Sequence, residues 1–323
     1  MTRADRIAGC LYGAAIGDAL GSAFEWVDAA AIERAVGEPF VWDYRPALVG
    51  SLLYPRKPGR PTDDTAMALS VASVVAAGGP FAAETFASRF IEDLERDHGR
   101  YAEMFWRGGP GGATTRALSR LRRGADPATC GHPNDGGNGA AMRVHPVGFL
   151  PDRHEVLAVA ALQARVTHGH PGAIAAAQAA AVLVYDALAG GAPSANVPPG
   201  VTEETFSDAW RRAHAGVVRG ESLPPHLRNV AMSGWETVAG AHAIALAYEG
   251  DPNRAIAAAV ASGGDTDTIG CIVGAIVGAR AGFGALRGDW IAGLRDDGRV
   301  GAVVTELTSA AAPSIPTNEK REE

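Results

Sequence analysis

The chain has 323 residues, of which 47% are hydrophobic, 20% are charged and only 7% are aromatic. This apolar content is enough to build one large core or two smaller ones. The formal net charge of −7 and the lack of any basic run exclude an electrostatic footprint for nucleic acid, which needs a basic patch.

The sequence gives no signal of a targeting or membrane-spanning segment. Its first nine residues, MTRADRIAG, carry charges and no apolar signal region. No stretch joins about 18 uncharged residues with the bulky apolar side chains of a membrane span. The three cysteines (Cys10, Cys130 and Cys271) lie far apart, and no Cys/His pair has zinc-site spacing. We therefore expect a soluble, cytoplasmic protein with buried, reduced thiols and no membrane partner.

Helical patterns dominate the chain from its first residues. Over 4–23, glycines recur every four positions (Gly9, Gly13, Gly17 and Gly21), which leaves one helix face bare for close packing. Nine further stretches are predicted to be helices: 66–77, 82–95, 114–122, 154–166, 171–189, 203–220, 235–248, 252–261 and 268–281. The only modest strand candidates are FVWDYRP and MRVHPVGFL. These patterns predict an all-α fold.

No internal repeat or interdomain linker interrupts this pattern. The loops rich in glycine and proline are short and lie at 54–61, 107–113, 130–139 and 190–200. The last residues, APSIPTNEKREE, are polar and have no apolar periodicity. We therefore predict one domain over 1–309, followed by a disordered tail over 310–323.

Three acidic clusters precede or end helices built of small residues. They are GDALGSAFE (with Asp18 and Glu25), PTDDT (residues 61–65) and GGDTDTIG (residues 263–270). One Thr-Asp pair at a helix start can be a cap with no further role. Several carboxylates brought together repel one another unless they are protonated or bridged by a cation. Carboxylate and hydroxyl oxygens without His or Cys suit Mg²⁺, Mn²⁺ or Ca²⁺, and so many acids favour two ions about 4 Å apart.

Three glycine-rich or histidine-containing loops are candidates for ligand contact. NDGGNGAAMR joins Asp135 and Asn138 to glycines that allow close approach, although an ordinary turn explains it equally well. THGHP places His168 before a helix, where a histidine serves a phosphate, a cap or a structural hydrogen bond. RGGPGG (107–112) also precedes a helix, and it either approaches a phosphate or simply turns.

Taken in this order, these segments resemble the ADP-ribosylglycohydrolase family. That family includes the glycohydrolase that reactivates dinitrogenase reductase and the ADP-ribosyl-acceptor hydrolases. The matching pieces are GAAIGDALGSAFE, TDDTAMAL, GNGAAMRVHPVG, THGHP and SGGDTDTIGCIVGAIVGARAG, spread over most of the chain. The resemblance implies a single compact, orthogonal all-α domain with two Mg²⁺ or Mn²⁺ ions, which hydrolyses the N- or O-glycosidic bond between ADP-ribose and an acceptor.

The resemblance also implies roles for individual residues. The implied metal ligands are Thr62, Asp63, Asp64, Asp265, Asp267 and Thr268. The candidates for the catalytic base are Glu25, Asp63 and Asp135, in no fixed order. The implied substrate contacts are Asn138, Gly139, Met142, His168, Gly109 and Gly111, with His168 at the diphosphate.

Two departures from the family pattern leave the substrate open. No aromatic residue precedes the GNG turn, where some members stack adenine, and Pro61 takes the place of the usual aromatic before TDD. An adenine platform would then come from elsewhere in the chain, with Phe105 and Trp106 as candidates, or be weak. The default substrate is ADP-ribosyl-arginine on a protein; ADP-ribosyl-serine, a modified nucleobase and a small ADP-ribosylated molecule stay possible.

Two rival functions remain. Another Mg²⁺/Mn²⁺ hydrolase would act on a nucleoside or a phosphoester, and it would release no ADP-ribose from a modified protein. A non-catalytic relative that binds ADP-ribose or has a structural role would show ligand-induced melting shifts without turnover. All six implied metal-ligand positions keep their residue types, which argues against an inactive relative.

Overall fold

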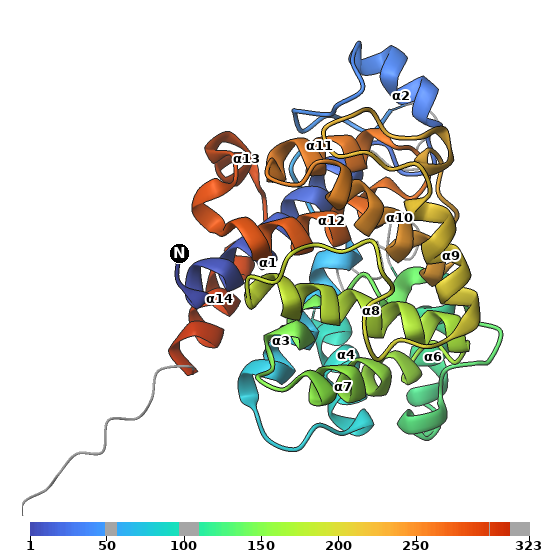
Figure 1. Cartoon of the computed structure of the whole chain (residues 1–323). Coiled ribbons are helices and arrows are strands. Elements are labelled where there is room, and N and C mark those ends of the chain that lie inside the picture. The colour runs from blue at the N-terminus through green and yellow to red at the C-terminus, as the bar shows by residue number, and fades with distance from the viewer. Residues whose placement is uncertain (49–56, 97–109, 297, 311–323) are drawn as a thin grey trace, which may run out of the picture.

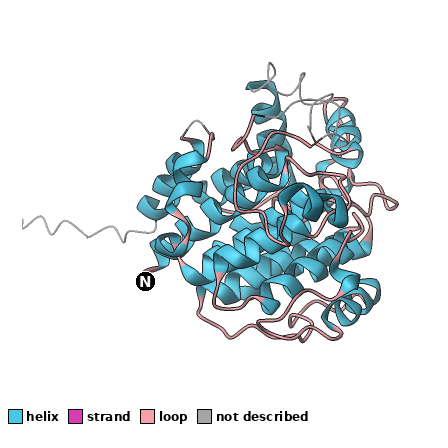
Figure 2. Cartoon of the chain, turned by 90° about the horizontal axis from the view of Figure 1, so that it is seen from above, coloured by secondary structure: helices cyan, strands magenta, loops and turns pink. Residues whose placement is uncertain are grey.

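The computed structural model describes residues 1–48, 57–96, 110–296 and 298–310. In this part of the chain every regular element is a helix, and β-pairing is limited to isolated bridges (Figure 2). The all-α prediction is confirmed. Both strand candidates are wrong: 40–46 is irregular, and 142–150 contains a short 3₁₀ helix. Neither segment has a neighbouring strand to pair with, and Val41 donates its backbone N–H to a helix carbonyl, that of Ala257.

All ten predicted helices are present, with shifted ends. The α-helices are α1 (Arg3–Gly21), α2 (Ala29–Val36), α3 (Asp63–Ala77), α4 (Ala83–Arg96), α6 (Gly112–Leu121), α7 (Arg153–Arg165), α8 (Pro171–Leu188), α9 (Glu204–His214), α10 (Gly234–Ala247), α11 (Pro252–Ala261), α12 (Thr266–Ala281), α13 (Gly288–Gly293) and α14 (Arg299–Ala310). The 3₁₀ helices are η1 (Pro127–Thr129), η2 (Asn138–Ala140), η3 (His145–Phe149), η4 (Pro225–Leu227) and η5 (Phe283–Ala285). Helices α2, α13 and α14 are additions to the predicted set. Helix α9 ends six residues early, before Gly216 in the left-handed region.

The helix starts follow from the side chains in front of them. Thr2, Asp28, Asp152, Ser233 and Asp251 each accept a hydrogen bond from a backbone N–H in the first turn of the following helix. Such caps satisfy N–H groups that have no partner within the helix. The polar residues between the helical segments therefore determine where the helices begin.

Helices α1 and α12 form the centre of the molecule and run antiparallel in contact (Figure 1). A Cβ atom added at Gly17 would lie 2.0 Å from the carbonyl oxygen of Gly270, and one at Gly21 would lie 2.3 Å from that of Thr266. The same holds along the whole glycine row of α1, as its four-residue spacing predicts. Because these positions lack side chains, the two backbones touch, and the end of α1 meets the beginning of α12.

Other helices pack around this pair. Helix α12 contacts α8, α10 and α11, and α1 also contacts α3 and α14. Their buried faces join in one continuous apolar core, rich in alanine and valine. Helix α8 is long and apolar enough, by length and composition, to cross a membrane, but 67% of it is buried inside the molecule. A buried core helix passes the same test of length and composition. The sequence alone did not identify this stretch as a possible membrane span.

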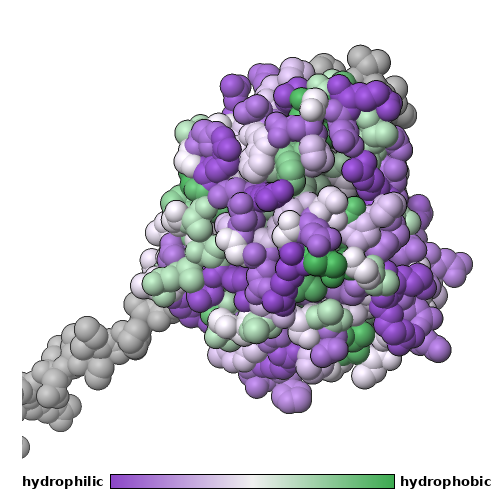
Figure 3. Space-filling model, turned by 45° about the horizontal axis from the view of Figure 1, so that its top comes forward, coloured by the Kyte–Doolittle hydropathy of each residue, from purple (hydrophilic) through white to green (hydrophobic). Residues whose placement is uncertain are grey.

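The face in Figure 3 is mostly hydrophilic, with its apolar residues in small separate patches. All three cysteines are buried and free, as predicted. Residues 311–323, which hold most of the predicted disordered tail, lie outside the described residues. The domain boundary at residue 309 stays a prediction.

We predict that Gly17→Ala destabilises the protein by more than about 2 kcal/mol, because its Cβ would overlap the backbone at Gly270 and force α1 and α12 apart. Urea unfolding measures this loss. Gly284→Ala is the matched control, since a Cβ at that exposed glycine meets nothing within 4 Å. Equal stability of the two variants would contradict the close packing.

Candidate metal and ligand site

A cleft of about 530 Å³ opens where the end of α1 meets the N-terminal ends of α3, α6 and α12. Its wall includes Glu25, Trp26, Asp63, Asp64, Gly111, Asn138, Gly139, Met142, His168, Met232, Asp265, Asp267 and Thr268. The structure therefore brings the three acidic clusters and all three candidate loops to one place.

Asp18 connects the first two acidic clusters. This fully buried carboxylate accepts the backbone N–H of Thr62 at 3.0 Å and, from Thr65, both the backbone N–H at 3.0 Å and the hydroxyl at 2.6 Å. It thus caps the first turn of α3 from a different helix. This contact fixes how Asp63 and Asp64 enter the cleft.

Asp265 stands at the N-cap position of α12 but makes no cap hydrogen bond. Every other Asp, Ser or Thr at an N-cap in the described part of the chain makes one. Instead, Asp265 accepts the side-chain N–H of Asn138 at 2.6 Å. Ligand atoms of Asp265, Asp267 and Glu25 all lie within 4.8 Å of one another. The carboxylate of Asp265 is therefore directed into an acidic cluster and not onto its own helix.

Burial and mutual repulsion disfavour the charged forms of these acids. The pKa of Asp18 is raised to about 6 by burial and by Asp267, against its hydrogen bonds. Burial, followed by the charge of Asp267, also raises the pKa values of Asp64 and Asp265 well above the ordinary range. One oxygen of Asp64, Oδ1, is enclosed and has no hydrogen-bond partner among the described residues.

These residues fit a divalent cation. Their donor atoms are all oxygens, which hard cations such as Mg²⁺ and Mn²⁺ prefer. A bound cation would contact the enclosed Asp64 Oδ1 and relieve the repulsion between the carboxylates. The residues in position to hold it are Asp63, Asp64, Asp265, Asp267 and Thr268, with Glu25 beside them.

His168 presents a hydrogen-bond donor to the cleft. The Thr167 hydroxyl accepts from the Arg143 guanidinium at 2.7 Å, and Nδ1 of His168, 2.8 Å away, is the only acceptor for its own proton among the described residues, so this buried hydroxyl donates to Nδ1. Burial lowers the pKa of His168 to about 3, so the ring is neutral. Its proton is therefore on Nε2, which has no partner among the described residues and is not enclosed. The arrangement suits an acceptor such as a phosphate oxygen.

Glycines at the start of α6 and at position 139 let the chain approach a ligand closely. Helix α6 starts at Gly112 with Gly111 as its N-cap, so no side chain caps its N–H groups, and both glycines line the cleft. Uncapped N–H groups at a helix start bind anions. A Cβ at Gly139 would lie 2.9 Å from the ring of His168, which explains the glycine there.

Some predicted site residues do not line the described cleft. The Thr62 side chain caps α3 by accepting the backbone N–H of Asp64, and Thr62 is not among the residues that line the cleft. Asp135 accepts from Arg116 at 2.6 Å and is also absent from the wall. Gly109 lies outside the described residues, as do the adenine-stacking candidates Phe105 and Trp106. The roles of these residues stay predictions.

The structure also adds residues to the site. The sequence marks Asp18 as an acid inside a helix of small residues, but no sequence pattern indicates that it caps α3. Arg143 is fully buried and holds Thr167 and, through the backbone, Gly139. Trp26 and Met232 line the mouth of the cleft and are 48% and 38% exposed. Both are apolar residues in irregular segments, which have no periodicity to mark them.

Comparisons with known proteins agree with the motifs. A model of the ADP-ribosylglycohydrolase family matches residues 1–320. The ADP-ribosyl-[dinitrogen reductase] glycohydrolase of Rhodospirillum rubrum is 26% identical, with 90% of each chain covered. The ADP-ribosylarginine hydrolase Tri1 of Pseudomonas putida is 26% identical, covering 89% of this chain and 73% of its own. A solved structure described as an ADP-ribosylglycohydrolase-related protein complex superposes with a TM-score of 0.74 at 28% identity, covering 96% of this chain and 99% of its own.

We predict that, without metal, the stability of the parent protein relative to Asp18→Asn falls by roughly 2–3 kcal/mol as the pH rises from 4 to 7. The folded-state pKa of Asp18, about 6, lies above the ordinary value of 3.8. Its contribution is therefore complete below pH 4 and is lost as the pH rises through 6. The variant retains the buried histidines, whose opposite pH dependence cancels in the difference.

Urea unfolding at several pH values in EDTA measures this difference. Asp152→Asn is the control, because Asp152 is an exposed cap of α7 that does not line the acidic cleft. A parent-to-variant difference that is constant from pH 4 to 7 would contradict the burial of an ionisable Asp18.

Proposed function

The chain belongs to the ADP-ribosylglycohydrolase family and is a hydrolase of ADP-ribose linkages, and on this premise we propose that it removes ADP-ribose from arginine side chains of proteins. We further propose that two Mg²⁺ or Mn²⁺ ions serve the reaction. The observation that carries the proposal is the acidic cluster in which Glu25, Asp265 and Asp267 converge, on one wall of a cleft that Asp63 and Asp64 also line.

The ligand set divides between two helix starts. The first turn of α3 offers Asp63 and Asp64, and the first turn of α12 offers Asp267 and Thr268, with Asp265 at its cap. Thr62 completes the proposed set next to Asp64. When bound there, the ions supply positive charge for the ribose hydroxyls and lower the pKa of a coordinated water.

The chain's own carboxylates then complete the hydrolysis. Breaking the glycosidic bond needs a base for the attacking water and a proton for the leaving group. Glu25 and Asp63 line the cleft, whereas Asp135 is engaged by Arg116 away from the wall. The arrangement therefore favours Glu25 or Asp63 as the base over Asp135. We assign Asp135 to positioning of Arg116 and the glycine loop.

Another part of the cleft lining suits the diphosphate of ADP-ribose. The Nε2–H of His168 and the uncapped N–H groups at the start of α6 are donors on the same cleft. Neutral donors of this kind bind phosphate oxygens without a fixed charge. Asn138, held by its bond to Asp265, and Met142 line the same cleft and would contact the ribose.

Trp26 favours arginine as the acceptor. Its ring is exposed at the mouth of the cleft directly after Glu25, and Met232 lies on the same wall. Trp26 also has a φ of 67°, a conformation that costs energy for a residue with a side chain. Its backbone N–H is held at 2.8 Å by the carbonyl of Gly264, beside the metal ligands. A guanidinium leaving group can stack on such an indole face.

The similarity to relatives supports a protein substrate. One relative acts, by its name, on ADP-ribosylarginine and another on ADP-ribosylated dinitrogen reductase. A partner ADP-ribosylated on arginine is therefore part of this proposal, as is a cytoplasmic location. Fractionation of cells that produce the protein tests the location.

We predict that Asp265→Asn and Asp267→Asn each lower kcat/KM for ADP-ribosyl-arginine protein at least about 100-fold, because each removes a charged oxygen ligand. Free ADP-ribose released by the purified protein is the readout, with EDTA and with added Mg²⁺ or Mn²⁺. Asp251→Asn is the control, since Asp251 caps α11 away from the cleft and Asn caps equally well. Hydrolysis at the parent rate by either cleft variant, or activity that survives EDTA, would refute the metal centre.

We predict that Trp26→Ala lowers kcat/KM for ADP-ribosyl-arginine about tenfold more than for ADP-ribosyl-serine, because only the guanidinium gains from the ring. Trp26→Phe should retain most of the preference. Val218→Ala, at another exposed apolar residue outside the cleft, is the control. An equal loss on both substrates would remove the argument for arginine.

A further inference from the structure

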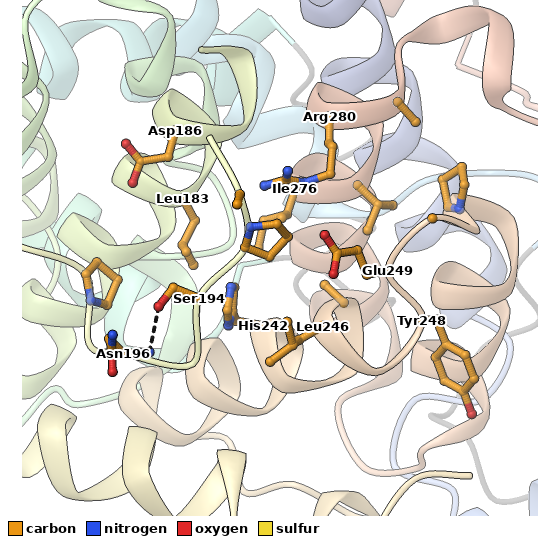
Figure 4. A pocket seen from close by; sticks show the side chains of 18 of the residues that line it. Leu183, Asp186, Ser194, Asn196, His242, Leu246, Tyr248, Glu249, Ile276 and Arg280 are labelled. Atoms are coloured by element: carbon orange, nitrogen blue, oxygen red, sulfur yellow. Dashed lines mark hydrogen bonds between the residues drawn. The ribbon is translucent and has the colours of Figure 1, made fainter. Parts of the chain in front are cut away.

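A second cavity, of about 460 Å³, lies far from the acidic cleft. It is enclosed by the C-terminal halves of α8, α10 and α12 and by the loop that carries Ser194 and Asn196 (Figure 4). Helix α12 has 16 residues and is therefore about 24 Å long, with the acidic cleft at its first turn and this cavity at its last. The two spaces are thus at opposite ends of the same helix.

The lining of this cavity is mainly aliphatic, with Leu183, Leu246 and Ile276 facing it from three helices. Three charged side chains also line it, and each already has a partner. Asp186 pairs with Arg153, Glu249 pairs with Arg219 at 3.0 Å, and Arg280 donates to the carbonyl of Gly191 at 2.6 Å. Both carboxylates are thus neutralised by arginines, and the Arg280 guanidinium is bound to a carbonyl with the charges of Glu249 and Asp186 nearby. A charged ligand would find no isolated opposite charge here, and burying it would be costly.

One buried polar atom on the wall has no partner. His242 is 3% exposed, and its Nε2 makes no hydrogen bond within the described residues. Nε2 keeps some accessible surface, and His242 lines the cavity, so Nε2 faces the cavity. This atom therefore gives the inner wall of the cavity a free hydrogen-bonding group, whereas the polar residues Ser194 and Asn196 are exposed in the covering loop.

The hydrogen-bond chain behind His242 decides what this atom can do. The Trp210 carbonyl can only accept, so Nδ1 of His214, 2.8 Å away, carries a proton. Burial lowers the pKa values of both histidines, so each ring is neutral. Nε2 of His214 is then an acceptor, and Nδ1 of His242 donates to it across 2.8 Å. His242 Nε2 is left with its lone pair, as a hydrogen-bond acceptor toward the cavity.

We propose that this cavity is a second binding site, which takes an uncharged, mainly apolar small molecule with one O–H or N–H group that donates to His242 Nε2. The aliphatic wall accommodates the body of the ligand. The charged groups on the wall, which are already engaged, disfavour an ion, and the free acceptor Nε2 of His242 selects a donor. The site is separate from the acidic cleft, and its existence does not depend on the hydrolase activity.

The probes that test this site are 2-naphthol and 2-methoxynaphthalene, which share a ring system but differ in the donor. NMR titration of the full chain should show saturable one-site binding of 2-naphthol, about fivefold tighter than the ether, as expected for one net hydrogen bond. His242→Phe should make the two affinities equal. His154→Phe, at an exposed histidine on α7, is the matched control and should keep the difference.

A second variant guards against misfolding of His242→Phe and against binding elsewhere. Ser194 is exposed in the covering loop, so Ser194→Trp should fold normally, fill the mouth of the cavity and weaken both probes. Circular dichroism checks the fold of each variant. The proposal is overturned if 2-naphthol shows no saturable binding up to its solubility limit, if the two probes bind the parent equally, or if Ser194→Trp leaves their binding unchanged.

Discussion

The contact between the backbones of α1 and α12 is the constraint on which the rest of the structure depends. A row of glycines on each helix lets the two backbones touch, and a Cβ added at any of these glycines would overlap a carbonyl oxygen of the partner helix. At the end of this row, the Thr266 hydroxyl donates to the carbonyl of Gly21 at 2.7 Å. The turn that carries Glu25 is thereby held against the start of α12. Larger residues would separate the two ends by the width of a side chain and disperse the acidic cluster.

This close approach also creates an electrostatic cost that the site must offset. Asp18, Asp64 and Asp265 are buried among like charges, which raises the pKa of each. Part of the cost is offset locally, because the first turns of α3 and α12 direct N–H groups and the positive end of each helix dipole at the acids. The repulsion between the carboxylates that remains favours the binding of a cation in the cleft. A cluster whose repulsion was fully relieved by protein groups would bind a divalent ion only weakly.

The sequence predicted the fold class and most helices because apolar periodicity, caps and glycine spacing are local properties. It also placed the acidic clusters at helix starts, since Thr and Asp there have a clear capping signal. Which residues from distant parts of the chain lie close together in space was harder to predict. That Asp18 caps α3 from another helix, or that Asp135 pairs with Arg116 off the cleft wall, depends on long-range packing that no local pattern records. Trp26 and Met232 escaped notice because an apolar residue in an irregular segment gives the same signal whether it is buried or exposed.

The two ends of the helix bundle differ in what they can bind, and helix polarity explains the difference. At the cleft, helix starts expose N–H groups, which suit phosphates and stabilise the carboxylates that hold cations. At the other end, the helix carbonyls are satisfied by arginines: Arg6 donates to the carbonyls of Ala187, Ala279 and Arg280, and Arg280 to that of Gly191. The cavity there has a mainly aliphatic wall with engaged charged groups, and Nε2 of His242 is a buried acceptor left free on it. The same bundle thus carries a charged, ion-binding end and a nearly neutral, apolar end.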